Sequence, residues 1–218
     1  MGSRLAALWV VLIAGVLIAG CGAPQYTFVA NTTDHAYFKV PNRWHKIADT
    51  ALAAEINSGS PPPAAGGGGP WSVGYDASTI PSASHALSPA TRQPFAFAQV
   101  GKLNSTTQNA MSYDGLRDFF LPVTAVARQI AASQGFPLTG FRLLHDALLT
   151  PGQGVHGVHV TFDYRYPDGS LDTFDQVAFT NADNTEVYVL LVHCLATCYS
   201  QHRSEINAVM SSFTVRSP

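Results

Sequence analysis

The sequence predicts an α+β fold, in which an antiparallel β-sheet packs against helices. Residues 158–166 alternate between apolar and polar side chains, and residues 171–179 return after a turn at 167–169, which indicates a β-hairpin. Residues 186–193 are apolar on both faces, as in a central, covered strand. The apolar side chains of residues 199–212 recur at helical spacing and predict a helix that packs on this sheet.

Shorter segments predict the rest of the sheet. Alternating or apolar runs bounded by proline, glycine or polar residues indicate further strands. These runs are residues 36–40, 71–76, 95–100 and 141–149, together with residues 42–47, which are predicted to form a turn followed by a short strand. Trp44 lies in residues 42–47, and an aromatic side chain at this spacing is expected in the core.

Two helices are predicted in the middle of the chain. Ser112 can cap the first, whose apolar residues recur at three and four positions and which ends before Pro122. Pro122 suits the first turn of the second, which runs from Val123 to about Ser133, with Gly135 just past its end.

We expect one domain, over residues 36–218. Two stretches rich in glycine, proline and serine, near residues 57–70 and 80–94, are predicted to be flexible loops between strands. Residues 21–35 are polar and rich in small residues, and they predict a flexible tether that reaches about 20 Å.

The overall charge excludes one class of partner. Lys and Arg number 12 against 14 Asp and Glu, so the formal net charge is -2. A protein that holds phosphate backbones needs a basic surface. The sequence therefore predicts no nucleic-acid partner.

Residues 1–20 predict a bacterial signal peptide. They contain Arg4 followed by an uncharged apolar run, which is shorter than the ~20 residues of a membrane-spanning helix. The ending Leu17–Cys21 resembles the lipobox, in which the cysteine receives a diacylglycerol on its sulfur. This resemblance implies lipid attachment at Cys21 and anchoring on the extracytoplasmic face of the cell membrane. An uncleaved anchor and an ordinary secretory signal are the alternatives.

Cys194 and Cys198 are the remaining cysteines. Export places them in an oxidising compartment, where two thiols at this spacing tend to pair, so a disulfide is the first expectation. A zinc site with His193 and His202 is an alternative, but adjacent residues of a strand point to opposite faces. A redox-active pair is a further alternative.

The familiar catalytic motifs give no match. Residues 152–157 have the spacing of a dinucleotide fingerprint, but they lead into a strand rather than a helix. The sequence has no phosphate loop, no nucleophile elbow and no zinc-protease helix. We expect no cofactor and no metal.

Histidines supply the remaining candidates for chemistry. His159 and Asp163 share a strand face but lie about 13 Å apart along the backbone, too far for a hydrogen bond. His159 or His156 could act as a base with a nearby acid, completed by Asp146 or His145. The main interpretation is that these are polar residues on an exposed sheet face.

Two arginines could hold an anionic group. Arg117 and Arg142 are candidates for binding a carboxylate or phosphate. Pairing with local acids is the more frequent situation for surface arginines. We therefore expect local ion pairs.

The chain resembles a family of actinobacterial lipoproteins and, more distantly, the PsbP-like fold. The resemblance is carried by Tyr37–Pro41 with Trp44, Leu116-Arg117, Leu121-Pro122, Gly157–Tyr164 and Ser211–Val215. It implies an antiparallel sheet between helical layers, an α/β/α sandwich. Similar folds serve as accessory or binding subunits, so the resemblance implies architecture more than activity.

The sequence therefore predicts a non-catalytic envelope lipoprotein, an accessory or binding module for a partner protein or an apolar envelope molecule. One alternative is an envelope hydrolase that uses His159 or His156 with a nearby acid. Another is a structural spacer without a ligand. A cavity between sheet and helices would favour the ligand carrier.

Overall fold

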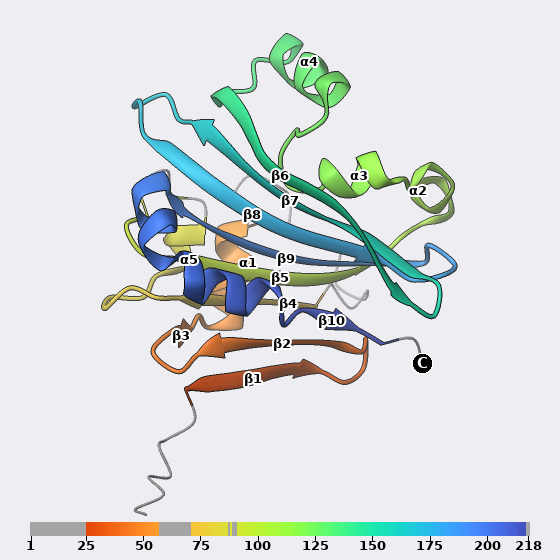
Figure 1. Cartoon of the computed structure of the whole chain (residues 1–218), viewed down its shortest axis with the longest axis horizontal. Helices are drawn as coiled ribbons and strands as arrows, with labels where there is room; N and C mark the ends of the chain where they lie inside the picture. Colours follow the sequence, from red (N-terminus) through yellow and green to blue (C-terminus); the bar gives the residue numbers. More distant parts are fainter. Residues whose placement is uncertain (1–24, 57–70, 87, 89–90, 217–218) are drawn as a thin grey trace, which may run out of the picture.

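The computed structural model describes residues 25–56, 71–86, 88 and 91–216. Within these ranges the strands form two antiparallel sheets (Figure 1), one in the order β1-β2-β10 and one in the order β3-β4-β5-β9-β8-β7-β6. The strands are β1 Tyr26–Asn31, β2 Ala36–Pro41, β3 His45–Lys46, β4 Trp71–Asp76, β5 Phe95–Lys102, β6 Thr139–Gly152, β7 Val155–Arg165, β8 Leu171–Thr180, β9 Glu186–Leu195 and β10 Thr214–Val215. The helices are α1 Asp49–Ile56, η1 Ala83–Ala86, α2 Ser105–Ala110, α3 Tyr113–Arg117, α4 Ala125–Ser133 and α5 Ala196–Met210.

Strand β9 lies at the centre of the larger sheet, as its sequence predicts. It pairs with β5 on one side and β8 on the other, and the side chains of residues 187–194 are buried on both faces. Helical layers cover both faces of the sheet (Figure 1): α3 contacts β7 and β8, and α5 contacts β8, β9 and β2. The α+β prediction is therefore confirmed.

The β7–β8 hairpin also follows the prediction, but its polar face does not. Gly169 takes a positive φ of 87° in the turn. Thr161 and Asp163, which were expected on an exposed face, are buried. Burial is tolerated because Asp163 accepts hydrogen bonds from Thr173 and Arg142, so the buried carboxylate is paired.

The predicted helices begin and end at somewhat different residues. Ser112 does cap α3, since its hydroxyl accepts from the Gly115 N–H, but α3 ends at Arg117. Thr124, rather than Pro122, opens α4, and Gly135 takes a positive φ past its end. Helix α2 was not predicted.

Part of the segment predicted to be a tether forms a strand. Residues 26–31, placed in the tether of residues 21–35, form β1 and pair with β2 along its length. Val29 is buried in the core between the small sheet, α5 and the larger sheet. Two buried side chains, Val29 and Asn31, and the pairing with β2 hold this segment in the fold, so ordered structure includes residues that the sequence placed in the tether.

Residues 80–86, in the stretch 80–94 that the sequence predicts to be a flexible loop, are ordered. The buried Asp76 carboxylate accepts hydrogen bonds from the Ser78 and Ser82 N–H groups and bonds to His85 Nδ1 at 2.6 Å. One acid at the end of β4 thus fixes the following segment and η1. The predicted signal peptide, Cys21 and the loop 57–70 lie outside the described residues.

Trp44 is buried in the core, as expected. In the part of the chain that the structure describes, no helix has the length and apolar character needed to span a membrane.

Candidate functional site

A pocket of about 810 Å³ lies between helix α5 and the face formed by β6, β7 and β8. One part of its wall is apolar and the other is polar. The apolar side chains are Leu144, Leu149, Val177, Phe179, Met210 and Phe213. The polar ones include His145, His159, Thr161, Asp175, Tyr199, Arg203 and Asn207.

Asp175 is the centre of the polar part. Its carboxylate is 1% exposed and lies 2.7 Å from His159 Nε2. The Tyr199 hydroxyl donates to the other carboxylate oxygen at 2.7 Å, and the Thr161 hydroxyl donates at 3.3 Å. Three side chains from β7 and α5 therefore satisfy one buried acid on β8.

The turn of the hairpin sets this arrangement. The Tyr166 N–H donates to the Ser170 carbonyl, which fixes the pairing of β7 with β8. From this pair the register brings Thr161 directly opposite Asp175. Strand alternation then puts His159 and Thr161 on the face of Asp175, within reach of its carboxylate.

Tyr199 is held as a neutral hydrogen-bond donor. Its position in the apolar stripe of α5 buries the ring. This burial raises the pKa of the hydroxyl well above its ordinary value of 10.0, and the negative charge of Asp175 makes the second-largest contribution to the rise. The nearby positive charge of Arg203 lowers this pKa, but by a smaller amount.

Of the predicted candidates, His145 and His159 line the pocket, and His159 is the one bound to Asp175. Its side chain is 27% exposed, and its ring is in edge contact with His145 at 4.9 Å between centroids. With Nε2 bound to Asp175, the acid fixes the orientation of the imidazole ring. The acid that pairs with His159 is Asp175, which the sequence reasoning did not name.

The other predicted candidates lie elsewhere. His156 hydrogen-bonds to the Gly154 carbonyl and packs against Tyr113, outside the pocket lining. Asp163 binds Arg142 and Thr173 instead of a histidine. The prediction that these residues lie on an exposed sheet face is therefore wrong for Asp163.

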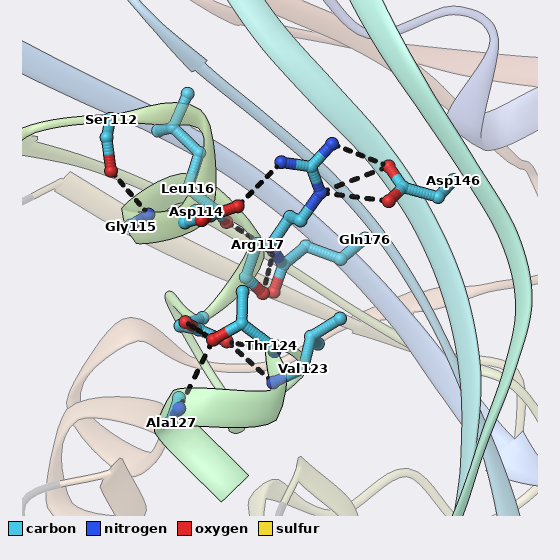
Figure 2. Close-up of polar contacts among 11 residues, drawn as sticks. Ser112, Asp114, Gly115, Leu116, Arg117, Val123, Thr124, Ala127, Asp146 and Gln176 are labelled. Atoms are coloured by element: carbon cyan, nitrogen blue, oxygen red, sulfur yellow. Dashed lines mark hydrogen bonds and ion pairs between the residues drawn. The ribbon is translucent and has the colours of Figure 1, made fainter.

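Arg117 is occupied by local acids, as expected. Figure 2 shows its guanidinium between Asp146 and Asp114, with Nε 2.9 Å from an Asp146 oxygen and Nη1 2.9 Å from an Asp114 oxygen. These contacts raise the pKa of Arg117, chiefly through the hydrogen bonds to Asp146. Asp146 is therefore engaged by Arg117, not by His159. Gln176 ties the same segment to β8 by donating to the Leu116 carbonyl.

Cys194 and Cys198 form a disulfide, as predicted. Both residues are buried, at the end of β9 and in the first turn of α5. The disulfide removes both thiolates from the alternative zinc set. His193, a third member of that set, packs between Phe95 and Phe174 instead.

The comparisons with known proteins establish the fold. No protein-family model and no curated protein matches the sequence. The solution structure of cyanobacterial PsbP (CyanoP) from Synechocystis sp. PCC 6803 is similar, with a TM-score of 0.54 and 14% identity over 90% of this chain and 96% of that chain. The chain therefore has a PsbP-like fold.

Two further solved structures are similar at lower scores. LpqN of Mycobacterium tuberculosis, described as involved in cell envelope biogenesis, has a TM-score of 0.46 and 15% identity over 88% of this chain and 91% of that chain. PA94 of Pseudomonas aeruginosa, described as a protein of unknown function and putative regulator, has a TM-score of 0.45 and 13% identity over 89% of this chain and all of that chain.

Proposed function

We propose that this protein is a lipid-anchored lipoprotein of the bacterial envelope, of the actinobacterial type, and that it holds an apolar small molecule without changing it chemically. The observation that carries the proposal is the pocket between α5 and strands β6–β8. Of the two kinds of partner that the sequence leaves open, a pocket favours a small molecule over a protein.

The size and lining of the pocket support a ligand. Ligand sites are typically clefts of about 300–1,000 Å³ with mostly apolar walls and a few polar groups that orient the molecule. This pocket has that size, and its apolar wall is continuous with the main core through Val177, Phe179 and Met210.

The anchor supports access to apolar molecules. Three residues lie between the proposed lipid-bearing Cys21 and Gln25, where the described residues begin, so four Cα–Cα steps join the two. Such a segment reaches at most about 14 Å. The domain would therefore lie close over the membrane, where apolar envelope molecules are concentrated.

Native mass spectrometry tests the proposal on a chain that begins at Gly22. This chain keeps all residues of the two sheets, the helices and the cores that pack between them. We expect the protein, exported and purified from its own cell envelope, to carry a bound mass.

Two tryptophan variants on α5 provide the matched comparison. Asn207 and Gln201 are both exposed, but only Asn207 lines the pocket. Asn207→Trp should lose the bound mass and Gln201→Trp should keep it. A wild-type protein without any bound mass would contradict the proposal and would favour a structural spacer.

The His159–Asp175 pair supports a second candidate, a hydrolase. A buried acid that orients a pocket histidine is the arrangement of a general base. If the protein is an enzyme, turnover in a screen of ester and phosphoester substrates should fall at least 100-fold in His159→Gln. Equal turnover in the wild type and this variant would remove the hydrolase, while the ligand carrier would stand.

A further inference from the structure

We infer that the ligand of this pocket is an amphiphile with one negatively charged head group, which Arg203 binds at the rim while the apolar body lies inside. The inference rests on the proposed function, because it assigns a chemical class to the molecule that the pocket holds. Three observations carry it. Asp175 is buried and hydrogen-bonded, Arg203 forms no ion pair with the described residues, and the side chains of the pocket wall range from exposed to buried.

The acid of the pocket is not available to a ligand. Asp175 is the acidic side chain in the lining, and its carboxylate is almost fully buried. One oxygen faces His159 and Thr161, and the other faces Tyr199. A positively charged ligand would therefore find no carboxylate to pair with.

Arg203 differs from the arginines discussed above. Arg43, Arg117 and Arg142 each form an ion pair with an acid. Arg203 lines the pocket, is exposed, and forms no ion pair or hydrogen bond with the residues that the structure describes. Its planar guanidinium can donate two parallel hydrogen bonds to a carboxylate or a phosphate.

The exposure of the lining gives the ligand a direction. Arg203 and Asn207 are exposed on α5, whereas Val177, Phe179 and Met210 of the same pocket are buried. A molecule that satisfies both parts has a charged end at the solvent side and an apolar body against the sheet. Arg203 lies one helical turn beyond Tyr199, so its charge lies near the polar centre.

Fluorescence titration with two matched probes tests the inference. The probes are 11-(dansylamino)undecanoic acid and its methyl ester, which share the apolar body and differ in the negative charge. We expect the chain from Gly22 to bind the acid about 2- to 5-fold more tightly than the ester at low salt, because an exposed ion pair contributes no more than this. The preference should shrink as the salt concentration rises.

Arg203→Gln should abolish the preference, because it should weaken binding of the acid more than binding of the ester. Lys102→Gln, which removes an exposed cation at the end of β5 that does not line the pocket, should keep the preference. Circular dichroism would verify that both variants are folded.

Displacement identifies the head group. Hexadecanoate or hexadecyl phosphate should displace the acid probe better than hexadecanol. The one that acts at the lower concentration shows whether the preferred head group is a carboxylate or a phosphate. Displacement by inorganic phosphate alone would contradict the amphiphile. Equal binding of the acid and the ester by the wild type would overturn the inference and leave the proposed function intact. If neither probe binds, the result would count against both the inference and the proposed function.

Discussion

At the scale of single residues, two buried acids of the same strand have opposite surroundings. Asp175 accepts three hydrogen bonds from side chains. Asp172 is fully buried, and neither of its oxygens has a hydrogen-bond partner among the described residues. His193 Nδ1 lies 3.7 Å from Asp172, which is beyond hydrogen-bond distance. Asp175 should therefore stabilise the fold around it, whereas Asp172 should lower the free energy of unfolding.

Removing one hydrogen-bond donor to Asp175 should measure how much this hydrogen bond contributes to the free energy of unfolding. Tyr199→Phe leaves a buried carboxylate oxygen without a partner, and we expect a loss of about 1–3 kcal/mol in the free energy of unfolding. Tyr188→Phe is the matched control, because its hydroxyl donates to Glu186, which is only half-buried and can bind water instead. Its loss should stay below about 1 kcal/mol. Urea denaturation measures both, and equal losses would contradict the special role of Asp175.

Asp172 gives a prediction about pH. Burial is the largest effect on its pKa and raises it above the ordinary value of 3.8, against a smaller lowering by His193. An acid with a raised pKa in the folded state contributes stability that is fully present below pH 3.8 and is lost as the pH rises through the folded-state pKa. At neutral pH Asp172 therefore lowers the stability of the folded protein relative to its stability below pH 3.8.

Asp172→Asn mimics the protonated acid and should raise the free energy of unfolding at pH 7. The difference from the wild type should shrink as the pH falls towards 4. Denaturation at several pH values measures this difference, and a variant that is less stable than the wild type at pH 7 would refute the prediction.

At the scale of elements, the junction of β9 and α5 positions Tyr199 and Arg203. Leu195 stands at the N-cap of α5 and supplies no side-chain hydrogen bond to the helix. The Cys194–Cys198 disulfide instead connects the end of strand β9 to the first turn of helix α5. We therefore assign the start of α5 to the disulfide and to the buried stripe of the helix.

The disulfide should stabilise the domain modestly. A loop this short contributes about 2 kcal/mol in the chain-entropy estimate, so Cys194→Ala with Cys198→Ala should lose about that amount. The mature protein should show no free thiol until it is reduced. Thiol labelling of freshly isolated, denatured protein checks this, and rapid labelling of both cysteines would contradict it.

At the scale of the whole molecule, α5 lies between the two sheets and contributes to both the core and the pocket. Ile206, Val209 and Met210 pack in the core that joins the small sheet to the large one. The side of the helix that carries Arg203 and Asn207 faces the pocket. The small sheet starts with β1 at Tyr26, and the proposed lipid-bearing Cys21 precedes it in the sequence.

The proposed lipid anchor gives the prediction at this scale. Metabolic labelling with an alkyne fatty acid should modify the wild-type protein, and Cys21→Ser should abolish the label and leave a precursor with residues 1–20 attached. Inhibition of lipoprotein signal peptidase should produce the same precursor length. Unchanged mass and unchanged membrane fractionation in both experiments would remove the lipid anchor.

The sequence by itself determined those features that depend on neighbouring residues. The turn at Pro167–Gly169 and the alternation beside it predict the β7–β8 hairpin, and counting back from this turn could also have placed Thr161 opposite Asp175. The apolar runs predict the central strand β9 and helix α5, and the spacing of Cys194 and Cys198 predicts their disulfide. In each case the interacting residues are close in the chain or share one short hairpin.

Only the tertiary structure decided which distant elements meet. Tyr199 reaches Asp175 because α5 crosses the sheet at β8, and β1 is ordered because β2 lies beside it. The periodicity of a segment reports that one of its faces is covered, but it does not report which element covers that face. The pocket therefore depends on how α5 packs against β6, β7 and β8, which follows from the packing of the whole core rather than from any single segment.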